Sequence, residues 1–227
     1  MLNKNSSLPL HKLKNMKNIQ EFTDEFNTFY NRVYNRWRLN IDPDTKKDIK
    51  EKSGKDIVGE EFELFRRKFY QSHLSDTNLS LSPKKDCKKI LGSIFDADLA
   101  LYQNGVIKLI EECKGSYVDS CFLKRAIGNF AELISVCQKN GKEVPFFVLS
   151  CPTKMGNFSE VFNSYICIFN DSIQSEIINK FKYLPLCKHG RVTKKGYYSS
   201  NKICFKLDDS LIEEQLSYVS DFKNLCK

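Results

Sequence analysis

Two carboxylates and one lysine in this sequence have the spacing needed to hold a metal ion and activate water. Glu112 and Lys114 are separated by one residue, and Asp98 precedes them along the chain. Alternate side chains of a β-strand project from the same face, so Glu112 and Lys114 would point together. Clustered carboxylates repel one another unless a cation lies among them. Oxygen-only ligands suit Mg²⁺, for which Mn²⁺ can substitute. The spacing therefore indicates metal-assisted hydrolysis, with a structural ion-pair network as the alternative.

These residues lie in two apolar segments that the sequence predicts to form a hairpin. The segments are Ile94–Tyr102 and Val106–Lys114, joined by Gln103-Asn104-Gly105. Asn-Gly between two apolar runs is a strong hairpin signal. A three-residue loop would pair Tyr102 with Val106 and place Asp96 opposite Glu112. Asp96 and Asp98 would then both share the face of Glu112, so either could be the principal metal ligand.

The rest of the chain predicts an α/β (α+β) fold with a mixed central β-sheet flanked by helices. Apolar residues recur at steps of three and four in the helical stretches, and uninterrupted apolar runs mark buried strands. Helices are expected over 19–37, 58–69, 118–137 and 173–181 and from Ser210 onward, further strands over 145–151 and 165–169, and a loop over 72–83.

The hairpin resembles the core of the PD-(D/E)XK nuclease superfamily, which includes most type II restriction endonucleases. Its pattern is an aspartate near the start of one strand, Glu-x-Lys on the neighbouring strand, and then a helix. Asp98-Leu99-Ala100-Leu101 and Glu112-Cys113-Lys114-Gly115 match it, within a resemblance that spans Gly92 to Cys151. Ala97 stands where the family often has proline. An apolar strand usually follows the family's aspartate directly, which favours Asp98 over Asp96.

The resemblance implies a restriction-endonuclease-like core and a site that hydrolyses phosphodiester bonds. Asp98, Glu112 and the backbone carbonyl of Cys113 would hold Mg²⁺, and Lys114 would orient the attacking water. Glu60 or Glu61, on the helix before the hairpin, is a further candidate ligand. The alternative is that these two are acidic residues at a helix N-terminus, where the helix dipole favours them.

The resemblance also implies the partners. The substrate would be double-stranded DNA cut at a short specific sequence, and a palindromic site would favour a homodimer. A cognate DNA methyltransferase would belong to the same system. The alternatives are a structure-selective nuclease, such as a junction resolvase or repair nuclease, and a non-enzymatic DNA-binding protein.

A basic segment supports a nucleic-acid partner. The formal charge is +8, and residues 182–206 contain lysine, arginine and tyrosine but no acidic residue. Such clusters gain free energy by releasing counterions from DNA, although a solvated loop is the alternative. The residues expected to contact DNA there are Lys182, Lys188, Arg191, Lys194, Lys195, Tyr197 and Lys202. Secondary contacts could come from Arg66, Arg67, Lys68, Lys124 and Arg125.

The cysteines indicate a reducing compartment. There are nine, an odd number at irregular spacing, which favours a cytoplasmic protein with free thiols. Cys187, His189 and Cys204 could also supply three zinc ligands.

No apolar run is long enough to span a membrane, and the N-terminus lacks a secretory signal.

The chain is expected to form a single nuclease domain over residues 1–227. Residues 1–55 would be a helical N-terminal extension and residues 56–181 the catalytic core. Residues 182–227 would be a basic DNA-contacting segment and a C-terminal helix.

Overall fold

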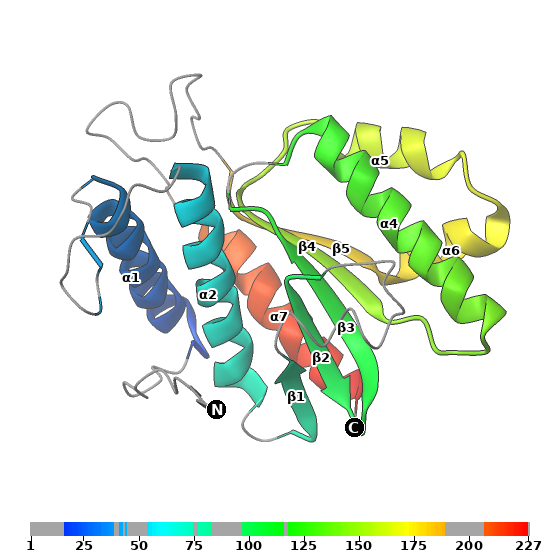
Figure 1. Cartoon of the computed structure of the whole chain (residues 1–227), viewed down its shortest axis with the longest axis horizontal. Helices are drawn as coiled ribbons and strands as arrows, with labels where there is room; N and C mark the ends of the chain where they lie inside the picture. Colours follow the sequence, from blue (N-terminus) through cyan, green and yellow to red (C-terminus); the bar gives the residue numbers. More distant parts are fainter. Residues whose placement is uncertain are drawn as a thin grey trace, which may run out of the picture.

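A five-stranded mixed sheet forms the centre of the molecule, with its strands in the order β1-β2-β3-β4-β5 (Figure 1). The computed structural model describes residues 16–38, 41–42, 44, 54–74, 77–82, 97–115, 118–188 and 207–226. Strands β1, β2 and β3 pair antiparallel, and β4 and β5 continue the sheet in parallel with β3. The strands are β1 (Leu79–Ser82), β2 (Leu99–Gln103), β3 (Val106–Cys113), β4 (Phe146–Thr153) and β5 (Phe181–Cys187).

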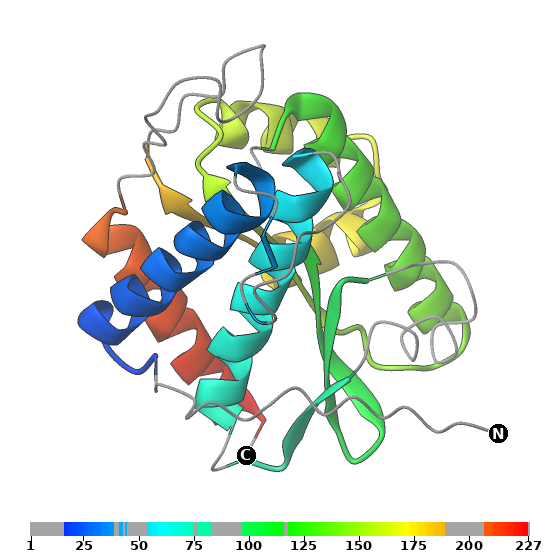
Figure 2. The same ribbon diagram turned by 60° about the vertical axis from the view of Figure 1, so that its left-hand side comes forward.

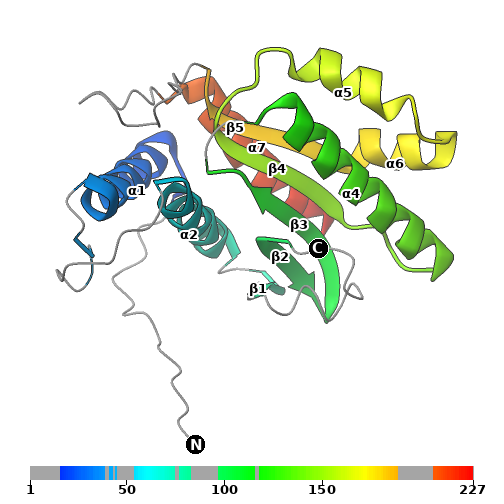
Figure 3. The ribbon, with the colours of Figure 1, turned by 45° about the horizontal axis from the view of Figure 1, so that its top comes forward.

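Helices cover both faces of this sheet, as Figure 3 shows. One face carries α4 (Ser120–Lys139), α5 (Phe158–Ile166) and α6 (Asp171–Lys180). The other carries α1 (Ile19–Arg38), α2 (Gly54–Leu74) and α7 (Asp209–Leu225). The predicted fold class, a mixed sheet flanked by helices, is confirmed. Within the described ranges, no helix has the length and apolar character needed to cross a membrane.

Phenylalanines hold α1 against α2. Phe22 lies edge-on to Phe65 and Phe69, with ring centroids 5.3 and 5.6 Å apart. Phe29 packs in the same way on Phe62, at 5.8 Å. Such edge-to-face pairs contribute roughly 0.5–1.5 kcal/mol each beyond the area that they bury. The apolar stripes that predicted both helices therefore form one continuous contact.

The hairpin turn is shorter than the sequence suggested. Asn104 and Gly105 form a two-residue turn with φ angles of 51° and 78°, the left-handed region that Asn-Gly favours. Gln103 pairs with Val106, and an irregularity between Leu101 and Tyr102 shifts the register. The predicted three-residue loop, which paired Tyr102 with Val106, is therefore wrong.

Three elements differ from their prediction. Residues 79–82, expected to lie in a loop, form the edge strand β1. The apolar run 165–169 was predicted to be a strand but is the end of α5 and the turn after it. The fifth strand is instead β5, at the start of the basic segment.

Helix α7 begins at Asp209 because the Asp208 side chain accepts a hydrogen bond from the Ser210 backbone N–H and caps the helix.

Candidate active site

The hairpin brings Asp98 and Glu112 together. Leu99 pairs with Glu111, so Asp98, one residue before β2, lies opposite Glu112. The Cys113 backbone N–H donates a 2.8 Å hydrogen bond to Oδ2 of Asp98, which fixes the orientation of that carboxylate. The observed register thus assigns the position opposite Glu112 to Asp98. Asp96, the other candidate, lies outside the described residues.

Glu112 and Lys114 lie on the face of the sheet that α4 covers. Ile110, two residues before Glu112, belongs to the core cluster on this face, and strand alternation gives Glu112 the same side. Oε2 of Glu112 is buried. The Lys114 ammonium lies 4.3 Å from the centre of the Phe122 ring on α4. The backbone N–H of Lys114 donates to the Ser150 carbonyl at 2.8 Å, so β4 holds it in place.

Helix α2 contacts the backbone at the start of β2 and at the end of β3, from the face of the sheet opposite α4. The Arg67 guanidinium donates a 3.0 Å hydrogen bond to the backbone carbonyl of Asp98, and it also pairs with Glu63 at 3.2 Å. A Cβ added at Gly115 would lie 2.6 Å from the Cα of Gly59, so the two backbones are in direct contact. Figure 2 shows the first turns of α2 and α4 at the same end of the molecule. The candidate site is therefore framed by two helices at the carboxyl end of β3.

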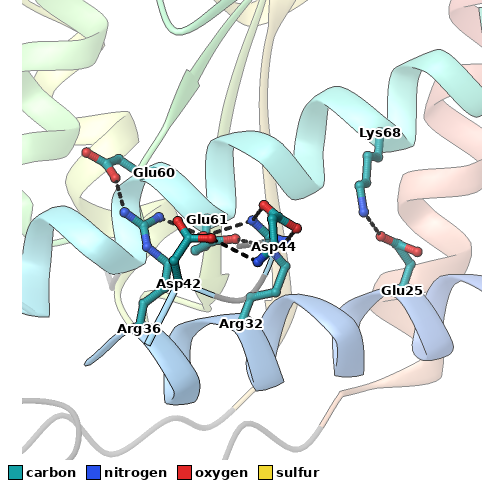
Figure 4. A network of polar contacts seen from close by, with 8 residues as sticks. All are labelled: Glu25, Arg32, Arg36, Asp42, Asp44, Glu60, Glu61 and Lys68. Atoms are coloured by element: carbon teal, nitrogen blue, oxygen red, sulfur yellow. Dashed lines mark hydrogen bonds and ion pairs between the residues drawn. The ribbon is translucent and has the colours of Figure 1, made fainter. Parts of the chain in front are cut away.

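Glu60 and Glu61 do not join the site. Glu61 is 2% exposed and accepts hydrogen bonds from Arg32 and Arg36 of α1, each at 2.6 Å. Glu60 pairs with Arg36 at 2.6 Å, and Asp44 binds the same α1 face through Arg32 (Figure 4). The expected metal role for Glu60 or Glu61 is not supported, because both carboxylates serve the contact between α1 and α2. Glu63, which the sequence reasoning missed, is the α2 carboxylate linked to Asp98 through Arg67.

Glu111, the neighbour of Glu112, points to the opposite face and is completely buried. Arg66, also completely buried, binds it through two hydrogen bonds of 2.6 and 3.1 Å. Tyr70 and Ser150 donate to the same carboxylate, and Gln215 of α7 accepts a 2.8 Å hydrogen bond from Arg66. The expectation that Arg66 contacts DNA is therefore wrong, since its guanidinium serves the core. Its position between Phe65 and Phe69 on the apolar stripe could have revealed this.

The thiol of Cys113 stays protonated at neutral pH. Burial raises its pKa well above the usual value, and the negative charges of Glu111 and Asp98 raise it further. A side-chain thiolate ligand from this position is thus unfavourable. The expected contribution of Cys113 through its backbone carbonyl stays a prediction.

The basic segment is only partly described. Lys182 lies in β5 and pairs with Glu214 of α7 at 3.0 Å. Lys188 pairs at 2.8 Å with Asp208, and this bond is the main reason that the pKa of Asp208 falls to about 2. Both lysine side chains remain about half exposed. Five expected DNA contacts lie outside the described residues, namely Arg191, Lys194, Lys195, Tyr197 and Lys202.

Of the three residues predicted as possible zinc ligands, the structure describes only Cys187. Cys187 is buried in the apolar cluster beneath α1, α2 and α7, and burial raises its pKa to about 12. His189 and Cys204 lie outside the described residues. Zinc binding at these three positions stays a prediction.

The donors present are compatible with Mg²⁺. Among the described residues, no three side chains of histidine, cysteine, aspartate or glutamate are grouped so that they could hold a metal ion. Mg²⁺, however, is commonly held by one or two carboxylates together with waters and substrate phosphates. Asp98 and Glu112 are two such carboxylates, placed opposite each other across the β2–β3 pair.

No protein-family model matches the chain, and no curated protein or solved structure matches it either. A functional proposal for this chain therefore rests on the residues of the site and their geometry.

Proposed function

We propose that the chain is a Mg²⁺-dependent endonuclease that hydrolyses phosphodiester bonds in double-stranded DNA at a short specific sequence. Asp98 and Glu112, with the Cys113 carbonyl, would be the metal ligands, and Lys114 would act on the attacking water. In this reading the chain belongs to the PD-(D/E)XK superfamily and is of the type II restriction kind.

One observation carries the proposal. The register of the β2–β3 hairpin sets Asp98 opposite Glu112, and Lys114 follows on the same face and against the ring of Phe122. Two carboxylates at this spacing can hold one Mg²⁺ ion together with waters and phosphate oxygens, and an ammonium beside them can offset the negative charge of a phosphate. The order of elements also supports the proposal, because the hairpin is followed by α4 and the parallel strand β4.

The surroundings of the site explain how its residues would work. The hydrogen bond from Cys113 to Asp98 fixes one carboxylate, and the parallel pairing with β4 fixes the backbone on both sides of Cys113. Such preorganisation lowers the cost of assembling the site during the reaction. Lys114 would orient the attacking water and offset the negative charge that builds up on the phosphoryl oxygens. When bound, Mg²⁺ would polarise the scissile phosphate and lower the pKa of water.

The finer assignments of partner and compartment belong to the same proposal. The net charge of +8 favours a polyanionic substrate. A homodimer would match a palindromic site, and a cognate methyltransferase would protect the host DNA. Each cysteine in the described ranges carries a free thiol, which supports the cytoplasm as the compartment.

Digestion of DNA tests the proposal. The purified chain is incubated with a long duplex of known sequence in Mg²⁺, in Mn²⁺ and in chelator, and the ends of the products are mapped. Discrete fragments in either metal and intact DNA in chelator are expected. Cutting restricted to four-way junctions would instead indicate a structure-selective nuclease. Binding without cutting in either metal would indicate a non-enzymatic DNA-binding protein.

A further inference from the structure

One aromatic ring joins two cations beside the candidate site. Phe122 is buried in the first turn of α4, where its backbone N–H donates a 2.7 Å hydrogen bond to the N-cap Asp119. The ammonium of Lys114 lies 4.3 Å from the centre of this ring. The guanidinium of Arg125 lies 4.7 Å from the same centre. Because residues three apart on a helix are neighbours, Phe122 and Arg125 form one surface that faces the end of β3.

We infer that Phe122 and Arg125 belong to the DNA-cleaving site, with Phe122 positioning Lys114 and Arg125 binding a second phosphate of the DNA backbone. This inference rests on the proposed nuclease function. The ligand class is a phosphodiester chain, which presents successive negative charges that two neighbouring cations can match.

Contact with the Phe122 ring restricts the Lys114 side chain before the substrate binds. A lysine side chain has many rotamers, and it loses that conformational entropy when it is fixed in one position. A cation over an aromatic ring is attracted by the ring's negative face, and the attraction is stronger where water is excluded. Phe122 therefore offsets part of the entropy cost before the substrate arrives. Phe122 is a positioning residue, because it acts through Lys114.

Arg125 is suited to binding phosphate. Its side chain is exposed, and among the described residues no carboxylate forms an ion pair with it. The planar guanidinium can offer two parallel hydrogen bonds to phosphate oxygens. Because the Lys114 ammonium and the Arg125 guanidinium both lie within 4.7 Å of the centre of one ring, they are no more than about 9 Å apart, an arrangement that an anionic substrate would stabilise.

The first test needs no DNA. In the full chain labelled with ¹³C-lysine, the ε-methylene protons of Lys114 should resonate upfield of those of Lys139, because they lie over an aromatic ring. Lys114→Arg assigns the signal. Phe122→Met, which keeps the volume without a ring, should return the signal to the position of Lys139, whereas Phe122→Tyr should preserve the shift. A Lys114 signal in the native chain that coincides with that of Lys139 would overturn the positioning role.

The second test uses the duplex that the native chain cuts. Phe122→Met should lower kcat about tenfold with little change in KM, and Phe122→Tyr should restore it. Arg125→Ala should raise KM about tenfold, the size expected for a lost charged hydrogen bond. In Ca²⁺, it should reduce the slope of log Kd against log salt by about one. Lys139→Ala, at the far end of α4, is the matched control for Arg125→Ala. It should change neither KM nor the salt slope.

The outcomes separate this inference from the proposed function. Unchanged KM and salt slope in Arg125→Ala, with a native chain that cuts DNA, would remove the phosphate contact and leave the nuclease in place. A native chain that neither binds nor cuts duplex DNA would overturn the function and the role of Arg125 together. In that case the lysine spectrum would still decide whether Phe122 holds Lys114.

Discussion

At the scale of single residues, the alternation of β3 places two adjacent glutamates on opposite faces of the sheet. Glu111 points toward α2, where Arg66, Tyr70 and Ser150 surround its carboxylate. Glu112 points toward α4 and faces Asp98 across the hairpin. Arg66 neutralises Glu111 within the core, whereas Glu112 is the glutamate that we propose as a metal ligand. Strand β3 therefore supplies one glutamate to the buried ion pair and the next glutamate to the candidate site.

The buried pair should be sensitive to loss of either partner. Arg66→Leu or Glu111→Leu alone should lower the free energy of unfolding by about 3–5 kcal/mol, because one charge stays buried without its counterion. The double variant should recover part of that loss. Lys108→Ala, which removes the more exposed pair with Glu143, is the control and should cost no more than about 1 kcal/mol. Urea denaturation measures all four, and a cost below 1 kcal/mol for both single changes would contradict this view of the core.

Part of the site could be predicted from the sequence. Side chains two residues apart on a strand point to the same face, so the sequence alone predicted that Glu112 and Lys114 share one face. The choice between Asp96 and Asp98 could not be made from spacing, because it depends on turn length and on the irregularity after Leu101. Arg66 was misassigned because charged residues usually lie at the surface, whereas tertiary packing here supplies a buried partner.

At the scale of elements, long periodic helices and the hairpin were predictable, and short segments were not. Helices α1, α2 and α4 are 20, 21 and 20 residues long and carry apolar stripes over several turns, so their period is unambiguous. Strand β1 has only four residues, too few to establish a period. The apolar run 165–169 could fit a buried strand or a helix end, and its packing on α4 decides for the helix.

The contact between α2 and the end of β3 should tolerate a methyl group on one side only. Gly115→Ala would place Cβ 2.6 Å from the Gly59 backbone, so α2 must shift. We expect a loss of about 1–3 kcal/mol in the free energy of unfolding, measured by urea denaturation. Gly59→Ala meets nothing within 4 Å, and it should be neutral or stabilising by up to about 1 kcal/mol. Equal effects of the two changes would show that the backbones do not touch.

At the scale of the whole molecule, a histidine buried in the helical layer of α1, α2 and α7 links stability to pH. His73, at the end of α2, is buried and hydrogen-bonded through Nδ1 to the Phe69 carbonyl at 2.8 Å. Burial lowers its pKa; the hydrogen bond to Phe69 opposes this, and the charges of Lys223, Lys17 and Arg66 add to the lowering. The unfolded chain, with a histidine pKa of about 6.5, therefore takes up the proton at higher pH than the folded one.

Stability should consequently fall as the solution is acidified. Between about pH 7.5 and the lowered folded pKa, the unfolded state binds more protons, so the free energy of unfolding decreases as pH decreases. The contribution of His73 cannot exceed about 1.4 kcal/mol per pH unit. His73→Gln, which keeps a donor but does not titrate, should flatten this part of the profile in urea denaturation at several pH values. Parallel profiles for the two proteins would show that His73 does not titrate differently on folding.

We propose that Glu112 is a ligand of the metal ion that DNA cleavage requires. The most direct measurement is the single-turnover rate of phosphodiester hydrolysis in saturating Mg²⁺ for the native chain, Glu112→Gln and Glu143→Gln. Glu143 is an exposed carboxylate that pairs with Lys108 of the same strand, so it controls for loss of one negative charge. Glu112→Gln should slow cleavage by at least roughly a hundredfold while DNA binding persists, because a direct ligand matters no less than its supporting residues. Glu143→Gln should cut at the native rate. Native-rate cleavage by Glu112→Gln, or no cleavage by the native chain, would contradict the account.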